Sequence, residues 1–139
     1  MKKEILFLAV LATCLSSFGQ TFEKTAQGGK FQTAQPTLNG EVIFYSPSIV
    51  RIVKYPSAEM PEKKSYPVIK TPEKVEISYK QNGNTVCMTS GKMTVTLDVV
   101  TGKVTYTDQK GETLLKEKVE GTNFIPRKDV NRDTFTVSQ

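Results

Sequence analysis

The feature that most constrains the fold is an alternation of apolar and polar side chains at the two-residue period of a β-strand. In "KMTVTLDV", residues 92–99, the apolar side chains fall on one face, and lysine, threonine and aspartate fall on the other. The same alternation recurs at 74–80, 103–107 and 134–138. One apolar and one polar face mean that such strands cover a core on one side and meet water on the other.

Short turns separate these alternating segments. Asn82-Gly83 lies between "VEISYK" and "TVCMTS", and Asn-Gly is the strongest two-residue signal for a β-hairpin. Glycine-containing turns also end two later segments, at "TG" and "DQKG". The region from Val75 to Val119 therefore predicts a meander of about five antiparallel strands, with turns at the spacing of a sandwich or barrel.

The front half is less regular but also predicts strands. Residues 22–35 fit one strand with a turn, and "EVIFYS" (41–46) and "IVRIVKY" (49–55) follow, interrupted by Pro47. The last two segments are apolar on both faces, which suits strands that are covered on both sides. Helical periodicity is absent after the first 20 residues, so we predict an all-β fold, an antiparallel β-sandwich.

The N-terminus has the pattern of a secretory signal peptide. Lys2 and Lys3 precede an apolar run at 5–15 and then small residues, which is the usual order of a signal. The apolar run is too short for a stable membrane span, which needs about 20 residues. We expect a signal peptide helix at 1–19, cleavage between Gly19 and Gln20, and one β-sandwich domain at 20–139.

A second interpretation of the N-terminus makes Cys14 a lipid-anchored first residue. Thr13 before it and Leu15 after it fit a lipoprotein signal less well than they fit the apolar part of a cleaved signal. Both interpretations imply export, and the expected location is periplasmic or extracellular. A single domain without a disulfide must then be held by its core, because Cys87 is the only cysteine that follows the signal.

Composition excludes several classes of function. The chain has no histidine, which removes Ser-His-Asp and Cys-His nucleophile arrangements and histidine-containing zinc sites. Its formal net charge of +5 is spread along the chain rather than gathered with aromatic residues, so we expect no nucleic-acid partner. Cys87 has apolar neighbours in a strand-like segment, which favours an inert thiol over a reactive one.

Arg51 and the Lys63-Lys64 pair are the basic residues that raise the question of a binding site. Arg51 shares its strand face with Ile49 and Val53, which favours a structural or edge arginine whose stem covers apolar surface. Prolines in the following segment exclude a strand interior there. We therefore interpret the two lysines as solvated charges of a loop.

No set of residues carries a clear catalytic pattern. The carboxylate pairs are Glu59/Glu62, Glu73/Glu76 and Glu117/Glu120, and all three are interpreted as solvated surface. Gly28-Gly29 has no helix after it to bind phosphate. The tyrosines that could stack on a sugar are Tyr55, Tyr66 and Tyr79, although packing inside a sandwich explains them equally well. We expect no catalytic residue, metal site or cofactor, and we assign no substrate-binding residue.

The order of these pieces resembles the N-terminal β-sandwich domain of glycoside hydrolase family 31, the family of α-glucosidases and α-xylosidases. The matching stretches are "FYSPSIVRIVKYP", "KKSYPVI", "TGKVTYTDQKGETLLKE" and "DTFTVSQ". Each motif is common in β proteins, but their order and spacing together are moderately specific. The resemblance covers about Val42 to Gln139.

The resemblance implies a sandwich with the fold of galactose mutarotase, followed by a (β/α)8 barrel that carries two catalytic aspartates. None of the barrel's motifs occurs in the sequence, so no catalytic residue can be transferred to it. The implied partners are this barrel and the carbohydrate substrate of the parent enzyme. The loop at 56–65 is a candidate to reach the sugar pocket, without assigned contacts.

Two functions remain open from the sequence. The first is a non-catalytic accessory domain of an exported α-glycosidase, which buttresses the barrel and helps to shape its sugar pocket. The second is a stand-alone exported β-sandwich that binds a glycan or a protein. In the first case we also expect apolar surface near 134–138 to be exposed when the barrel is absent.

Overall fold

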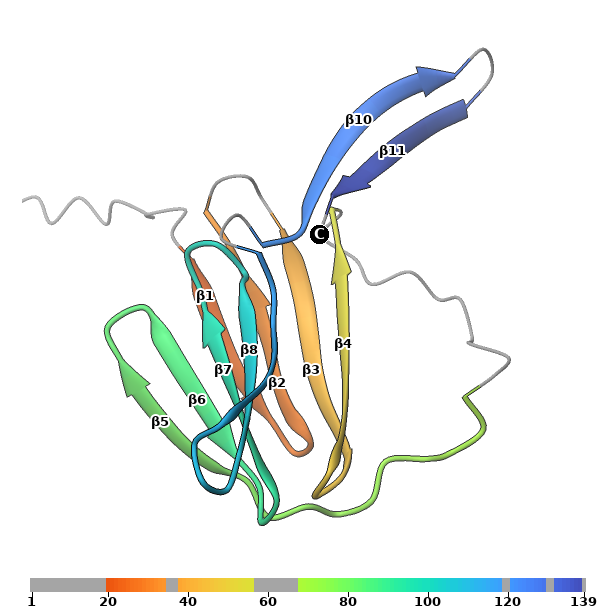
Figure 1. The fold of residues 1–139 in the computed structure, drawn as a ribbon. Helices are drawn as coiled ribbons and strands as arrows, with labels where there is room; N and C mark the ends of the chain where they lie inside the picture. Colours follow the sequence, from red (N-terminus) through yellow and green to blue (C-terminus); the bar gives the residue numbers. More distant parts are fainter. Residues whose placement is uncertain (1–19, 35–37, 57–67, 119–120, 130–131, 139) are drawn as a thin grey trace, which may run out of the picture.

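The computed structural model describes residues 20–34, 38–56, 68–118, 121–129 and 132–138, so the expected signal peptide, its cleavage site and Cys14 lie outside the described residues. The described part contains strands and no helix. A four-stranded antiparallel sheet has the order β1-β2-β3-β4, a five-stranded antiparallel sheet has the order β5-β6-β7-β8-β9, and β10 pairs with β11 (Figure 1). The predicted all-β antiparallel fold is confirmed, and a β-sandwich is consistent with it.

The first sheet is built from the front half of the chain. Its strands are β1 (Thr21–Thr25), β2 (Gly28–Gln32), β3 (Asn39–Ser46) and β4 (Ile49–Tyr55). Pro47 and Ser48 form the turn between β3 and β4, and the register shifts between Phe44 and Ser46 just before it. Pro47 therefore separates two strands of a hairpin, as its lack of a backbone N–H predicts.

The second sheet is the predicted meander of five strands. It consists of β5 (Ser78–Asn82), β6 (Thr85–Thr89), β7 (Met93–Asp98), β8 (Val104–Asp108) and β9 (Thr113–Lys116). Asn82 pairs with Thr85, so the first turn is Gly83-Asn84 and not Asn82-Gly83 as the sequence suggested. Gly83 has a positive φ of 55° at the first turn position, where a type II′ hairpin turn takes glycine.

The segment at 74–77 was predicted as the start of a strand, and this prediction is wrong. The backbone N–H of Glu73 donates to the carbonyl of Tyr45 at 3.1 Å, so this stretch bonds to the first sheet before β5 begins. Figure 1 shows the segment 68–77 running beneath both sheets on its way to β5. Val75 is nevertheless buried, because the crossing chain carries it under the core.

The core lies between the two sheets. Its buried members are Phe31, Leu38, Val42, Phe44, Val75, Val86, Met88, Val95, Leu97, Val99 and Val104. The alternation seen at 92–99 explains this directly, since Val95 and Leu97 are fully buried while Thr94 and Thr96 are not. The β7–β8 turn also contacts the first sheet: Gly102 has φ +69°, and a Cβ there would come within 2.7 Å of Leu38 Cδ2.

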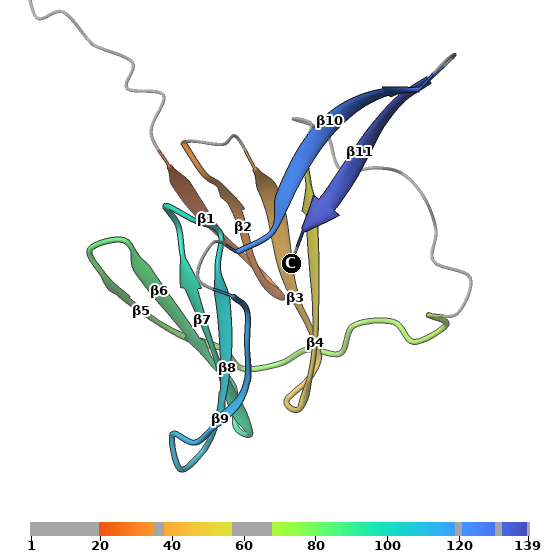
Figure 2. The same ribbon diagram turned by 45° about the horizontal axis from the view of Figure 1, so that its top comes forward.

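The last two strands, β10 (Asn123–Asp129) and β11 (Arg132–Ser138), form a ribbon that projects from the sandwich (Figures 1 and 2). Phe124 packs partly against the core and meets Phe135 edge-on at 6.2 Å. Phe135 and Val137 are 47% and 50% exposed. This half-exposed face agrees with the exposed apolar surface expected near 134–138, and within the described residues β10 and β11 pair only with each other.

Candidate functional site: a groove along the edge strand β4

The candidate site follows β4, the last strand of the first sheet. Within the described residues β4 pairs with β3 alone, so its other side is a free edge. Val50 and Ile52 pack partly against the core, and Arg51 lies between them in sequence, near the middle of the strand. The expected edge position of Arg51 is thus observed.

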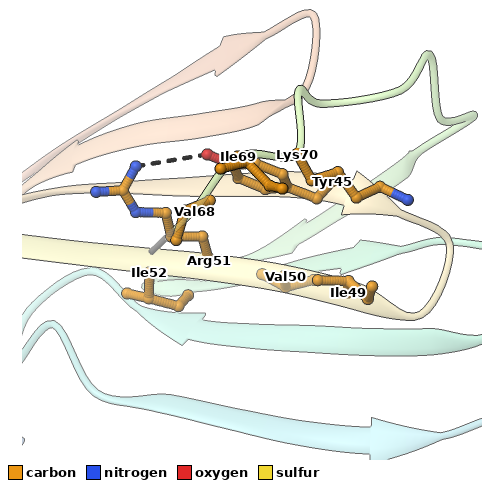
Figure 3. Close-up of a pocket in the computed structure, with 8 residues that line it drawn as sticks. All are labelled: Tyr45, Ile49, Val50, Arg51, Ile52, Val68, Ile69 and Lys70. Atoms are coloured by element: carbon orange, nitrogen blue, oxygen red, sulfur yellow. Dashed lines mark hydrogen bonds between the residues drawn. The ribbon is translucent and has the colours of Figure 1, made fainter. Parts of the chain in front are cut away.

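An apolar depression of about 540 Å³ lies along the first half of β4 (Figure 3). It is lined by Tyr45, Ile49, Val50, Arg51, Ile52, Val68, Ile69 and Lys70. Ile49 and Ile69 are 50% and 93% exposed. Figure 3 shows Arg51 extending beside Tyr45, and its Nη1 donates to the Tyr45 hydroxyl at 3.4 Å, which is long for a hydrogen bond.

A polar depression of about 490 Å³ lies along the second half of the strand. It is lined by Arg51, Ile52, Val53, Lys54, Tyr106, Glu117, Thr122 and Phe124. The two depressions share Arg51 and Ile52. We call them together the β4 groove, which borders the strand from Ile49 to Lys54.

A buried ion pair between the two sheets forms one wall of the β4 groove. Lys54 Nζ lies 2.7 Å from Glu117 Oε1 and 2.6 Å from Glu117 Oε2, and it also donates to Thr122 Oγ1 at 3.2 Å. Glu117 Oε2 in turn accepts the backbone N–H of Val104 at 2.8 Å. Only 6% of the Lys54 side chain and 21% of the Glu117 side chain are exposed. The carboxylate therefore joins β4, β8 and the chain leading to β10.

The interpretation of Glu117 as solvated surface is wrong, because its carboxylate is the partner of Lys54. The strand pattern of the sequence contains one indication of this ion pair. Lys54 falls on the same strand face as Val50 and Ile52, and a lysine on a buried face requires a carboxylate and hydrogen-bonding partners. What the sequence lacked was the location of that carboxylate, 63 positions further along the chain.

Burial changes the protonation of two groups in the polar depression. Desolvation lowers the pKa of Lys54, while the hydrogen bond and the charge of Glu117 act in the opposite direction. Desolvation and the Glu117 charge together raise the pKa of Tyr106 from 10.0 to about 12. The Tyr106 hydroxyl therefore stays neutral at any physiological pH and can act there as a hydrogen-bond donor.

The raised pKa of Tyr106 predicts a loss of stability in alkali. The folded chain keeps this proton at a pH where the unfolded chain has lost it, so the contribution is complete below pH 10.0 and disappears as the pH approaches about 12. The lowered pKa of Lys54 has the opposite sign and favours folding as pH rises toward 10.5. Urea unfolding of the wild type and of Tyr106→Phe between pH 9 and 11 isolates the tyrosine: the free-energy advantage of the wild type should shrink above pH 10.

Other residues singled out by the sequence have structural surroundings. Glu73 pairs with Lys70 at 2.6 Å on the surface, and Glu76 is exposed, so both are solvated as expected. The Cys87 thiol is partly buried on β6, with its Sγ 3.7 Å from the Thr96 hydroxyl. Residues 59, 62, 63, 64, 66 and 120 lie outside the described residues.

The two described tyrosines proposed for sugar stacking pack instead within the protein. Tyr55 is buried. The hydroxyl of Tyr79 donates to the carbonyls of Thr25 and Gly28 at 3.2 and 2.7 Å, which connects β5 to the β1–β2 turn. Gly28 begins strand β2, so Gly28-Gly29 belongs to a sheet and not to a phosphate-binding turn.

The described residues show neither a metal site nor a membrane-spanning helix. They contain no group of three or more histidine, cysteine, aspartate or glutamate side chains placed to hold a metal ion. They also contain no helix with the length and apolar character needed to cross a membrane.

Comparison with known proteins agrees with one part of the expected role. The all-β fold and a sequence match to a glycosidase support a glycosidase-associated β domain. The match is to "Alpha-glucosidase 2" of Bacillus thermoamyloliquefaciens, with 34% identity over 90 residues, which is 65% of this chain. The chain spans 11% of the length of that relative. No family model matches the sequence.

Proposed function

We propose that the chain is a non-catalytic N-terminal accessory domain of an exported α-glycosidase similar to family 31, with a galactose mutarotase-like sandwich. Its role is to buttress a catalytic (β/α)8 barrel and to help shape the sugar pocket of that barrel. The observation that carries the proposal is the 90-residue similarity to an α-glucosidase, of which it spans 11%. A similarity that covers so small a share of the α-glucosidase is what a supporting domain would give.

The surface of the sandwich also favours a supporting role. The β4 groove and the apolar face of the β10–β11 ribbon expose large aliphatic and aromatic side chains, among them Ile69, Phe135 and Val137. Large exposed apolar side chains that gather in one place often mark an interaction surface. A neighbouring domain that covers these two places would supply the missing contacts.

The proposal predicts that the chain alone hydrolyses neither an aryl α-glucoside nor an aryl α-xyloside. Neither depression of the β4 groove is lined by the pair of carboxylates that glycoside hydrolysis requires, and the one carboxylate that lines the groove is held by Lys54. Release of nitrophenol above the buffer rate would contradict this prediction. The matched control is the Glu117→Gln variant, which should behave like the wild type in this assay.

A chimera tests the accessory role itself. The 90 aligned residues of the Bacillus α-glucosidase would be replaced by those of this chain, and a second chimera would carry an unrelated β-sandwich of similar length. We expect soluble and active enzyme from the first chimera and insoluble or inactive enzyme from the second. Equal failure of both chimeras would count against the accessory role and favour the stand-alone sandwich, whose partner would then be a glycan or a separate protein.

Export is the remaining part of the proposal and rests on the order of lysines, apolar run and small residues at 1–19. Mass spectrometry of the product from a secreting host should find Gln20 at the N-terminus. A product that begins at a lipidated Cys14 would instead establish the alternative anchor, and an uncleaved chain in the cytoplasm would contradict export.

A further inference from the structure

We propose that the free edge of β4 is a strand-addition site, at which an extended segment of a partner polypeptide with an acidic side chain near its middle pairs with Ile49–Tyr55. The inference does not depend on the proposed function. It rests on one edge strand and on the groove beside it, and it applies equally if the partner is a separate protein.

The first step is the unpaired backbone of β4. Along its free side, alternate residues of an edge strand direct N–H and C=O groups that no ladder satisfies. Proteins usually protect such edges with charges, prolines or very short strands. β4 has seven residues, four of them aliphatic, and the side chain of Lys54 is turned inward and buried. Arg51 is the other charged side chain of this strand, and its hydrogen bond goes to Tyr45 on β3, on the side away from the free edge.

The other edges of the two sheets are less suited to pairing. β1 has five residues and carries Glu23 and Lys24 among mostly exposed positions. β5 also has five, with the polar sequence "SYKQN", and β9 has four. Of the four edge strands described in the two sheets, β4 is the longest and the most apolar. A partner strand would gain the most main-chain hydrogen bonds and apolar contact there.

The second step is the space beside the edge. The apolar depression and the polar depression follow β4 in succession and overlap at Arg51 and Ile52. Their volumes of about 540 and 490 Å³ leave room for side chains of an added strand along the full stretch from Ile49 to Lys54. In strand addition, the main chain supplies affinity and the pockets beside the edge supply specificity.

The third step is the charge at the centre of the groove. Among the described residues Arg51 has no ion pair, and its guanidinium reaches the neutral Tyr45 hydroxyl at 3.4 Å. Lys54 and Lys70 are paired with Glu117 and Glu73. Directly opposite side chains on adjacent antiparallel strands have Cβ atoms about 5 Å apart, so an aspartate or glutamate opposite Arg51 can reach its guanidinium.

The ends of the groove specify the rest of the partner. Aliphatic side chains fit near Ile49 and Ile69, where the lining is apolar. Hydroxyl or amide side chains fit near Tyr106 and Thr122, which line the polar depression. The partner segment therefore runs from an apolar end through an acidic centre to a polar uncharged end.

A second copy of this chain is the less suitable occupant. Antiparallel pairing of two β4 strands centred on Ile52 would place Arg51 opposite Val53 of the other copy, with the two arginines as diagonal neighbours about 7–8 Å apart. β4 carries no carboxylate to compensate them. Repulsion between two arginines at that separation disfavours the pairing, whereas an acidic side chain on a partner segment would attract Arg51.

The experiment uses the whole chain and a blocked seven-residue peptide with aliphatic side chains at one end, aspartate at the centre and threonines at the other. The same peptide in reversed order covers the opposite strand direction. We expect one of the two to bind and to slow hydrogen exchange at alternate backbone amides between Ile49 and Tyr55, because every second N–H points to the free edge. Two N-methylated versions of the binding peptide would be made, one with the odd-numbered and one with the even-numbered backbone amides methylated. The version whose methyl groups replace the N–H groups that point toward β4 should lose binding, and the other should retain it.

Charge reversal gives the sharpest control. Arg51→Glu should weaken binding of the aspartate peptide at least tenfold. A peptide with lysine in place of the aspartate should bind the Arg51→Glu variant at least tenfold more tightly than the aspartate peptide does. The matched control, Lys80→Glu on the far edge strand β5, should change neither affinity. The thermal transition of each variant shows that it is folded.

Three outcomes would overturn the proposal. The first is the absence of binding by both peptide directions to a folded chain. The second is binding without alternating protection of the β4 amides, which would indicate non-specific adhesion. The third is concentration-dependent dimerisation that protects these amides without peptide, which would assign the edge to a second copy of the chain.

Discussion

Replacing Lys54 by methionine is expected to lower the free energy of unfolding by about 3–5 kcal/mol, the usual cost of removing one partner from a buried ion pair. The Glu117 carboxylate would then remain 79% shielded from water with no cation. Methionine is unbranched and only one atom shorter than lysine, so the loss mainly measures the uncompensated charge and not a cavity. Urea or thermal unfolding at pH 7 provides the measurement.

Two controls separate the ion pair from general effects of lysine loss. Lys30→Met removes a lysine that is 58% exposed and lies 3.1 Å from Glu41, so it should cost far less than Lys54→Met, because exposed ion pairs contribute little to stability. The double variant Lys54→Met/Glu117→Gln leaves no buried charge and retains an acceptor for the Val104 N–H, so it should recover most of the loss. A double variant as unstable as Lys54→Met would refute this account of the pair.

The strand pattern was predictable because alternation depends only on neighbours in the sequence. The five-stranded meander follows from period-two patterning, and the β3–β4 hairpin follows from two apolar segments that Pro47 interrupts. The shift of the first meander turn by one residue, to Gly83-Asn84, is of a different kind. Either frame uses a glycine and leaves Val86 and Met88 on the same face of β6, so apolar patterning does not choose between the two turns.

The candidate site was less predictable, since it depends on contacts between distant segments. Arg51 was correctly placed on an edge, but the depression beside it is completed by Val68–Lys70, which reach β4 only because the crossing chain passes beneath the sheets. The Lys54–Glu117 pair likewise joins residues 63 positions apart. Sequence periodicity can assign a lysine to the buried face, but it cannot identify the carboxylate that meets it.

The position of the β10–β11 ribbon also could not be predicted from sequence periodicity. Its alternation is as regular as that of the core strands, and Phe135 and Val137 do share one face. Periodicity indicates that one face is apolar, but it does not say what covers that face. A two-stranded ribbon is marginally stable by itself in water, so its Phe124 anchor on the sandwich is what holds it in the described structure.

Replacing Phe44 by alanine is expected to cost about 3–5 kcal/mol, the range for removing a fully buried aromatic side chain. Phe44 is completely buried on β3, between the two sheets. A domain of this size has a total stability of about 5–15 kcal/mol, so the variant should lose about 15 °C in Tm or fail to fold. Differential scanning calorimetry gives the value directly.

The matched control is Phe135→Ala, which removes the same ring from a position that is 47% exposed. It loses an edge-on contact with Phe124 at 6.2 Å, worth about 1 kcal/mol, and leaves the sandwich core intact. Its Tm should therefore fall by only a few degrees. If Phe135→Ala were as destabilising as Phe44→Ala, the ribbon would belong to the cooperative core. The apolar face of the ribbon could then not serve as free surface for a neighbouring domain, and that part of the accessory role would have to be abandoned.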